Sequence, residues 1–194
     1  MSLTAKDTGS DFVLTPTGNH LGICYLLVGL GRQETNFGIK EQVLIGWELP
    51  NELMEDGRPF AISKQYTLST NEKANLRKDL EAWRGRSFSE AEVESFNLKN
   101  ILGKPCMVAV IHNNKNNKTY ANVASIASVP KGMNVPKKCN ETVCYDVDEP
   151  EETIFKKLPE WIQKKVLAAI QLPQGTIDNN ELNPPDFIDE DIPF

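Results

Sequence analysis

Basic and aromatic side chains recur in and beside the strand-like segments of this 194-residue chain. A protein holds single-stranded nucleic acid without reading its sequence when cations follow the phosphates and aromatic rings stack on the bases. Tyr66 is favoured as a stacking ring, because alternation along a strand puts it on the same face as Lys64. Aromatic residues on strands more often pack inward, so a core position is the alternative for each ring. The candidate cations are Arg32, Lys40, Lys64, Arg84, Arg86, Lys115 and Lys118, and the candidate rings are Phe37, Trp47, Tyr66 and Tyr120.

A second group of residues at the end of the sequence has the composition of a docking peptide. Asp189, Glu190 and Asp191 precede Ile192, Pro193 and Phe194. A partner with a small apolar pocket rimmed by Arg or Lys could bury an aromatic ring of this peptide while pairing with its carboxylates. The alternative is a solvated acidic tail that only aids solubility. We therefore predict that residues 189–194 bind a protein partner.

Catalytic signatures are few. The sequence has no glycine-rich phosphate loop, no nucleophile elbow and no histidine-rich metal set. The carboxylates of Glu48, Glu52, Glu55 and Asp56 could hold Mg²⁺ as in nucleases, although a solvated loop is the simpler interpretation. Cys139 and Cys144 have a spacing that suits zinc, but no second pair of ligands is near. We predict a non-enzymatic protein without metal or cofactor.

Charge is divided unevenly along the chain, whose formal net charge is −6. No basic residue follows Lys165, whereas six acidic residues do. The sign reverses in residues 58–88, which hold seven basic and three acidic residues. A low overall isoelectric point therefore hides a basic segment that is compatible with a nucleic-acid partner. The polar first eleven residues lack the apolar core of a signal peptide, and no apolar run is long enough to span a membrane, so a cytoplasmic location is expected.

The elements that must position these residues follow from hydrophobic periodicity. Alternation and turn signals predict strands over 21–30, 37–49 and 60–68, a helix over 69–85 that begins at Ser69, Thr70 or Asn71, and a short helical turn over 89–96. Two further strands, 107–112 and 120–129, are joined by an Asn-rich and Lys-rich turn. Three strands, a helix and two strands are the order of a five-stranded OB-fold barrel, with the helix between strands three and four. A five-stranded sandwich is the alternative.

The C-terminal third differs in composition. Residues 130–152 are rich in Pro, Lys, Asn and acidic residues, which is typical of a loop or an irregular strand lying against the barrel. Residues 158–170 show an apolar stripe at helical spacing, predicting a helix that docks on the barrel or, alternatively, at a dimer interface. Residues 171–185 have the composition of a disordered tether. The predicted organisation is a flexible lead-in over 1–18, a domain over 19–170, and a tether with its acidic tip over 171–194.

Two parts of the chain resemble known families. Residues 189–194 resemble the acidic tip of bacterial single-stranded DNA-binding proteins, which recruits replication and repair enzymes. The segments 60–69, 73–86, 102–106 and 120–126 are similar to phage and prophage OB-fold proteins that are thought to bind single-stranded DNA. The barrel carries none of the strand motifs of the cellular bacterial family, so the tetrameric assembly of that family is not expected here.

The resemblance implies a protein that coats and protects single-stranded DNA in phage-type replication or recombination, in the cytoplasm of a bacterial host. Partner enzymes would be recruited through the acidic tip. A replication adaptor with little DNA affinity and, more weakly, an OB-fold nuclease are the alternatives. A homodimer is possible, and the sequence does not distinguish DNA from RNA as the ligand.

Overall fold

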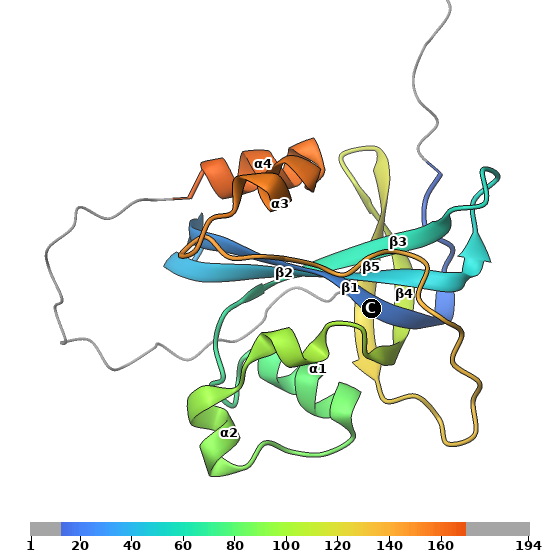
Figure 1. The fold of residues 1–194 in the computed structure, drawn as a ribbon, viewed down its shortest axis with the longest axis horizontal. Helices are drawn as coiled ribbons and strands as arrows, with labels where there is room; N and C mark the ends of the chain where they lie inside the picture. The colour runs from blue at the N-terminus through green and yellow to red at the C-terminus, as the bar shows by residue number, and fades with distance from the viewer. Residues whose placement is uncertain (1–12, 170–194) are drawn as a thin grey trace, which may run out of the picture.

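The protein is mainly β, with a mostly antiparallel sheet and helices on two sides of it (Figure 1). We describe residues 13–169 from a computed structural model. The sheet order is β3-β2-β1-β4-β5, and β6 pairs in parallel with β1. The elements are β1 (Gly18–Thr35), β2 (Gly38–Leu53), β3 (Pro59–Thr67), α1 (Asn75–Arg84), α2 (Glu90–Ser95), the 3₁₀-helix η1 (Leu98–Ile101), β4 (Pro105–Lys115), β5 (Lys118–Ala127), β6 (Val143–Tyr145), α3 (Glu152–Lys157) and α4 (Glu160–Leu167).

The first two strands form a long, strongly bent hairpin. β1 runs well beyond the predicted residues 21–30, because it serves two neighbours in succession: its first residues pair with β4, and residues from Ile23 onward pair with β2. Register shifts between Cys24 and Leu26 and between Gly29 and Gly31 mark bulges, which bend a strand and increase its twist. A Cβ at Gly46 would lie 2.9 Å from the Leu26 Cβ, so a glycine is needed where the two strands approach.

Strand alternation sorts the apolar residues of the sheet into two cores. The inner core combines Trp47, Ile62, Tyr66 and Val108 with the buried face of α1. It lies on the concave side of the curled sheet. β3 and β5 lie beside each other at the two ends of the strand order without ladder pairing, so the sheet is open at this seam. The predicted order of three strands, a helix and two strands is confirmed, whereas barrel closure is not shown.

Helix α1 begins later than the sequence predicted. Residues 69–74 form turns in which the Asn71 side chain accepts a hydrogen bond from the Lys73 amide, and the N-cap is Ala74. The side chains of Ser, Thr and Asn compete for backbone groups in this way, so a capping pattern can close a turn instead of starting a helix. The end is as predicted, because Gly85 adopts the left-handed conformation with φ 66°. The short helix after it has the predicted capping box between Ser89 and Glu92.

The C-terminal segment covers the outer face of β1 and β2. Leu26, Val28, Leu30 and Leu44 point away from the inner core. They pack against Leu158 at the end of α3, Ile162 and Val166 of α4, and Tyr145 of β6. The apolar stripe of α4 therefore docks on the sheet, as the first of the two predicted alternatives required. Sequence reasoning did not identify β6, which lies within the stretch 130–152 predicted to be irregular. It also missed α3, which lies between that stretch and the predicted helix, and η1 between α2 and β4.

Candidate nucleic-acid interface

The β4–β5 hairpin projects from the sheet with an exposed, acid-free tip. Every residue from Ile111 to Tyr120 is exposed, and Asn116 and Asn117 have φ values of 52° and 59°, as a two-residue type I′ turn requires. Lys115 and Lys118 are register partners beside this turn, and Tyr120 is 47% exposed. Val123 faces the inner core, so alternation turns Tyr120 and Asn122 outward. The hairpin thus offers two ammonium groups and a phenol ring to solvent.

Helix α4 lies over the outer face of the sheet and reaches β3 through Lys165. α4 and the β4–β5 hairpin rise from the same side of the sheet in Figure 1. The Lys165 side chain hydrogen-bonds Gln65 of β3, while Gln33 of β1 donates to the Lys165 carbonyl at 2.9 Å. Lys40 is the register partner of Gln33, so it lies on the same outward face of the sheet. The outward side of the sheet therefore carries cations from β2 and from α4, and the hairpin with its two lysines projects from the same side.

Trp161 adds an aromatic ring to this surface. It is 47% exposed and stands one turn before Lys165, so both project from the side of α4 that faces β3. The sequence pattern did not identify Trp161, because the apolar stripe of Leu158, Ile162 and Val166 indicates only which residues face the sheet. A large aromatic residue just off an otherwise regular apolar stripe is the signal that could have found it.

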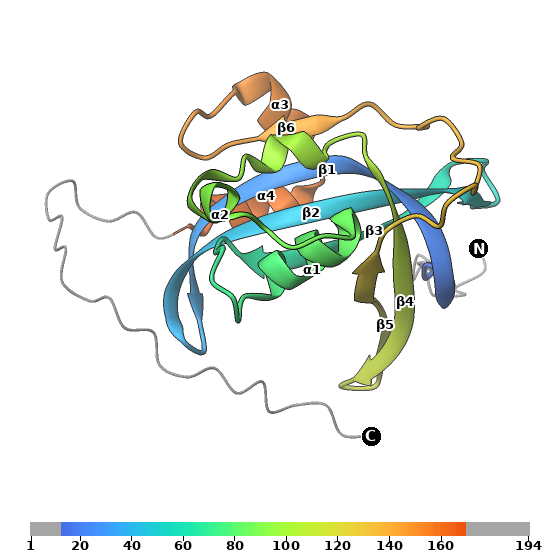
Figure 2. The same cartoon turned by 90° about the horizontal axis from the view of Figure 1, so that it is seen from below.

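The two hairpins end on the same side of the molecule (Figure 2). Phe37, at the turn between β1 and β2, is 61% exposed, so of its two alternatives the core position does not apply, and its role as a stacking ring stays a prediction. The turn is closed locally, since Thr35 Oγ1 donates to the Gly38 carbonyl at 2.7 Å. A strand of nucleic acid that crosses the outward face would meet one hairpin at each end.

Two predicted stacking rings are instead core residues. Trp47 is fully buried and packs against Trp83, with ring centroids 5.9 Å apart. Tyr66 is 4% exposed, and its hydroxyl donates to Asp79 at 2.7 Å. Burial and the negative charge of Asp79 raise the pKa of this phenol. Alternation correctly placed Tyr66 beside Lys64, but their shared face is the inner one, closed by α1. Neither ring can stack on a base.

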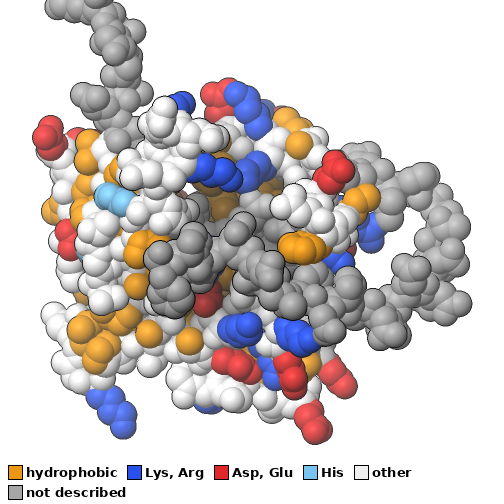
Figure 3. All heavy atoms as spheres, turned by 180° about the vertical axis from the view of Figure 1, so that it is seen from behind, with side chains coloured by type: hydrophobic (Ala, Val, Ile, Leu, Met, Phe, Trp, Pro, Cys, Tyr) orange, Lys and Arg blue, Asp and Glu red, His pale blue; other side chains and the backbone are white. Residues whose placement is uncertain are grey.

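Several predicted cations are held by carboxylates. Lys64 Nζ lies 2.8 Å from Asp79 Oδ2, beneath α1, and Arg32 Nε lies 3.6 Å from Glu41. Arg84 and Arg86 both bind Glu92. Hydrogen bonds from Arg86, from the Ser89 amide and from Arg84 lower the pKa of Glu92 to about 2. In Figure 3 the basic side chains in the lower part of the view, where α1 and α2 lie, stand directly beside acidic ones. These four cations are a poor choice for phosphate binding.

The stretch 95–140 is a basic segment that sequence reasoning missed. It contains seven lysines and no acidic residue. None of the seven forms an ion pair with a described residue. Two of them are Lys115 and Lys118 of the hairpin. The missed signal was the absence of acids, which a search for dense basic runs does not detect.

The predicted acidic cluster does not assemble into a metal site. Glu48 is fully buried and accepts hydrogen bonds from the backbone amides of Cys139 and Asn140, each at 2.7 Å. Glu52 binds His20, and Asp56 binds Arg58. Within residues 13–169, no group of three or more His, Cys, Asp or Glu side chains is placed to hold a metal ion. Glu48 fastens the loop after β5 to the sheet, so the magnesium alternative fails at its central residue.

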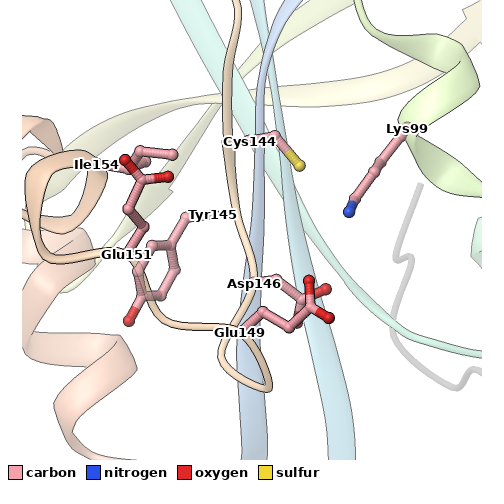
Figure 4. A pocket seen from close by; sticks show the side chains of 7 residues that line it. All are labelled: Lys99, Cys144, Tyr145, Asp146, Glu149, Glu151 and Ile154. Carbon is pink, nitrogen blue, oxygen red and sulfur yellow. The ribbon is translucent and has the colours of Figure 1, made fainter.

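A hollow of about 210 Å³ beside β6 brings together side chains of mixed charge (Figure 4). Lys99 and Cys144 point toward it, and Asp146, Glu149 and Glu151 line its rim. Burial raises the pKa of the Cys144 thiol, so it is protonated at neutral pH and a poor nucleophile. The hollow has no arrangement that supports covalent chemistry.

Other predictions fall partly outside the described residues. The lead-in over 1–18 is described only from residue 13, and the tether and acidic tip over 171–194 lie wholly outside, so the tip stays a prediction. Residues 13–169 hold 20 basic and 19 acidic residues, and the negative net charge of the chain therefore comes from the segments on either side. In the part that the structure describes, no helix is long and apolar enough to cross a membrane.

No protein-family model matches this chain, and no curated protein matches it either.

Proposed function

We propose that this protein binds single-stranded nucleic acid without reading its sequence, along the outward face between its two hairpins. We call this surface the hairpin–α4 face and define it by Phe37 and Lys40, Gln65, Lys115, Lys118 and Tyr120, and Trp161 and Lys165. It combines cations for phosphates with exposed rings for bases, which is the combination that such binding needs.

The observation that carries the proposal is the β4–β5 hairpin. Lys115 and Lys118 are exposed, and no described acidic group pairs with them. A half-exposed Tyr120 stands beside them with asparagine donors. A structural hairpin needs neither unopposed charge nor an exposed ring, whereas a strand-binding surface uses both.

The strand order supports an OB-type assignment. A β3-β2-β1-β4-β5 order with a helix between β3 and β4 is the OB order opened at the β3–β5 seam, and OB barrels are partly open. In that fold, oligonucleotides lie over strands two and three, flanked by the β1–β2 and β4–β5 loops. The hairpin–α4 face takes residues from the corresponding elements, the two hairpins, β2 and β3, with α4 lying over part of the outer face.

We propose that the role is to coat and protect single-stranded DNA in phage-type replication or recombination, with residues 189–194 recruiting partner enzymes. The chemistry of the face suits DNA or RNA, since stacking and phosphate contacts serve both polymers.

The test is an anisotropy titration of labelled oligo-dT at about 50 and 200 mM salt. The proposal predicts binding at micromolar protein or below that weakens at least about tenfold over this range, because displaced counterions oppose binding. Oligo-dT of the same length annealed to its complement is the control, and it should bind more weakly because its bases are stacked internally. Absence of salt-dependent binding to oligo-dT would contradict the proposal and favour the alternative of a replication adaptor with little DNA affinity.

A further inference from the structure

A small apolar cavity lies between α1 and η1, on the side of the sheet opposite α4 (Figure 1). Its volume is about 220 Å³. Leu80, Trp83, Phe96 and Ile101 supply an almost entirely apolar lining, and the basic residues Arg84 and Lys104 border it. The Trp83 indole already donates to the Pro105 carbonyl at 2.7 Å, so the aromatic wall is fixed in place.

The size of the cavity indicates what it can accept. Pockets for drug-sized molecules measure about 300–1,000 Å³, so this one suits one or two apolar side chains of a peptide. Hydrophobic cavities of this size on a surface are typical anchor sites for a peptide, with specificity supplied by charges at the rim.

The charges at the rim select an acidic peptide. Lys104 is exposed and forms no ion pair with a described residue. Arg84 stacks over Phe88 and Phe96, at 4.7 and 5.2 Å from their ring centroids, and so is held at the cavity wall. Its Nη1 is buried and has no hydrogen-bond partner among residues 13–169. The one carboxylate that binds Arg84, that of Glu92, is shared with Arg86. Positive charge is therefore in excess here.

We propose that the cavity between α1 and η1 binds residues 186–194 of the same chain, with Ile192 or Phe194 inserted between Trp83 and Ile101. This segment interleaves four carboxylates with Phe187, Ile188, Ile192 and Phe194, and residues 170–194 contain six acids and no base. Twenty-five residues can span at most about 80 Å, about twice the diameter expected of a 157-residue body. The segment is complementary in charge and apolar content, and it is long enough.

Docking at this site would hold the acidic segment away from the hairpin–α4 face. Its carboxylates would then not compete with phosphates while docked, and a protein partner would have to displace the segment before binding it. The cavity and the hairpin–α4 face are different surfaces, so peptide docking and nucleic-acid binding can each be tested without the other.

The first test uses full-length protein and backbone amide NMR. Replacing Ile192 and Phe194 with Ala removes the anchors but leaves the acids. We expect amide shifts across residues 96–104 relative to wild type, with the same size at two protein concentrations tenfold apart. Shifts that grow with concentration would assign the occupant to a second copy and overturn the intramolecular proposal, and unchanged amides in 96–104 would overturn docking altogether.

The second test measures binding in trans. A labelled peptide of residues 186–194 is titrated with the full-length I192A/F194A protein, whose own anchors are disabled. We expect saturable binding that Lys104→Glu weakens at least about fivefold, because one attraction is replaced by a repulsion. Lys99→Glu is the matched control, since Lys99 is an exposed lysine of the neighbouring 3₁₀-helix that does not line the cavity. Equal weakening by both variants would indicate general charge attraction and contradict a site at this cavity.

Discussion

Residues 58–92 and residues 95–140 each contain seven basic residues, but the fold uses them differently. The first stretch also holds five acids, and the second holds none. In the first, Lys64, Arg77, Arg84 and Arg86 pair with Asp79, Glu81 and Glu92, and Arg58 pairs with Asp56. In the second, no lysine is paired with a described acid. A basic segment in a sequence is therefore a binding surface only where the fold leaves its charge unopposed.

The difference has a structural origin. A helix places residues four apart side by side, as with Arg77 and Glu81. In a helix that carries both basic and acidic residues, the charges therefore tend to pair with each other. The capping box of α2 adds another constraint, because Glu92 must point back toward Ser89 and there meets Arg84 and Arg86. A two-residue hairpin turn offers no such neighbours. Lys115 and Lys118 face each other across the ladder and repel, which a purely structural hairpin would avoid.

Charge reversal at the hairpin should give the largest effect. Lys115→Glu with Lys118→Glu is expected to weaken oligo-dT binding about a hundredfold at low salt, because two phosphate contacts become repulsions. Arg58→Glu with Arg86→Glu makes the same change in net charge at two exposed but paired residues, and should cost less than about threefold. Anisotropy titrations of the wild type and the two double variants check this. Similar losses in both double variants would break the comparison between the two segments.

Removing the Asp79 carboxylate, which α1 directs toward the sheet, should change stability and leave binding unchanged. Asp79→Ala leaves Lys64 Nζ and the buried Tyr66 hydroxyl without their partner, and we expect a loss of about 2 kcal/mol in the free energy of unfolding. Urea denaturation measures it. Oligo-dT affinity should stay within about twofold of wild type for the folded protein, since neither Lys64 nor Tyr66 belongs to the hairpin–α4 face. A binding loss as large as the stability loss would return Lys64 to the interface.

Truncation of an exposed ring should have a smaller effect on binding. Tyr120→Ala is expected to weaken oligo-dT binding by about 1–2 kcal/mol, the value of one stacked base, with little change in stability. Tyr66→Phe is the control: it keeps a buried ring, removes the bond to Asp79, and should destabilise by about 1 kcal/mol without changing affinity. If Tyr66→Phe weakened binding more than Tyr120→Ala, the assignment of core and surface rings would be wrong.

Lowering the pH should reduce the stability that the Glu92 carboxylate contributes, by a modest amount. Because Arg86, Ser89 and Arg84 lower the pKa of Glu92 from 4.5 to about 2, this carboxylate stabilises the fold above its ordinary pKa, and the contribution is lost as pH falls from about 4.5 toward 2. Glu92→Gln should therefore be less stable than wild type at pH 6, and this difference should shrink at pH 2. Denaturation at a series of pH values checks it; a constant difference would contradict the linkage.

Sequence patterns predicted the strands and helices well, but they did not predict which face of the sheet is buried. The order of strands and the helix between β3 and β4 came from periodicity and turn residues, and the docking of α4 from its apolar stripe. Periodicity places Tyr66 and Lys64 on one face but does not say whether that face is inside, because this depends on how α1 folds back over the sheet, which is a tertiary contact. β6 was missed since three residues carry no readable period, and its pairing with β1 is a tertiary contact.

The candidate site was predicted only in its exposed parts. Phe37, Tyr120, Lys115 and Lys118 lie in hairpin turns, whose exposure is local and readable from turn residues. Trp161 was missed, because whether a ring at the edge of a helical stripe faces solvent or the sheet depends on how the helix is rotated on its partner. The pairing of Arg84 and Arg86 with Glu92 also depends on the packing of α2 against the end of α1.

The salt dependence of oligo-dT binding tests the central claim most directly. The slope of log Kobs against log salt counts the cations that replace counterions, at about 0.7 per phosphate on a single strand. We predict that Lys115→Gln with Lys118→Gln lowers the magnitude of this slope by about 1.4, while Arg58→Gln with Arg86→Gln leaves it unchanged. An unchanged slope in the hairpin variant, or an equal decrease in both, would contradict the claim that unopposed lysines of the β4–β5 hairpin hold the strand.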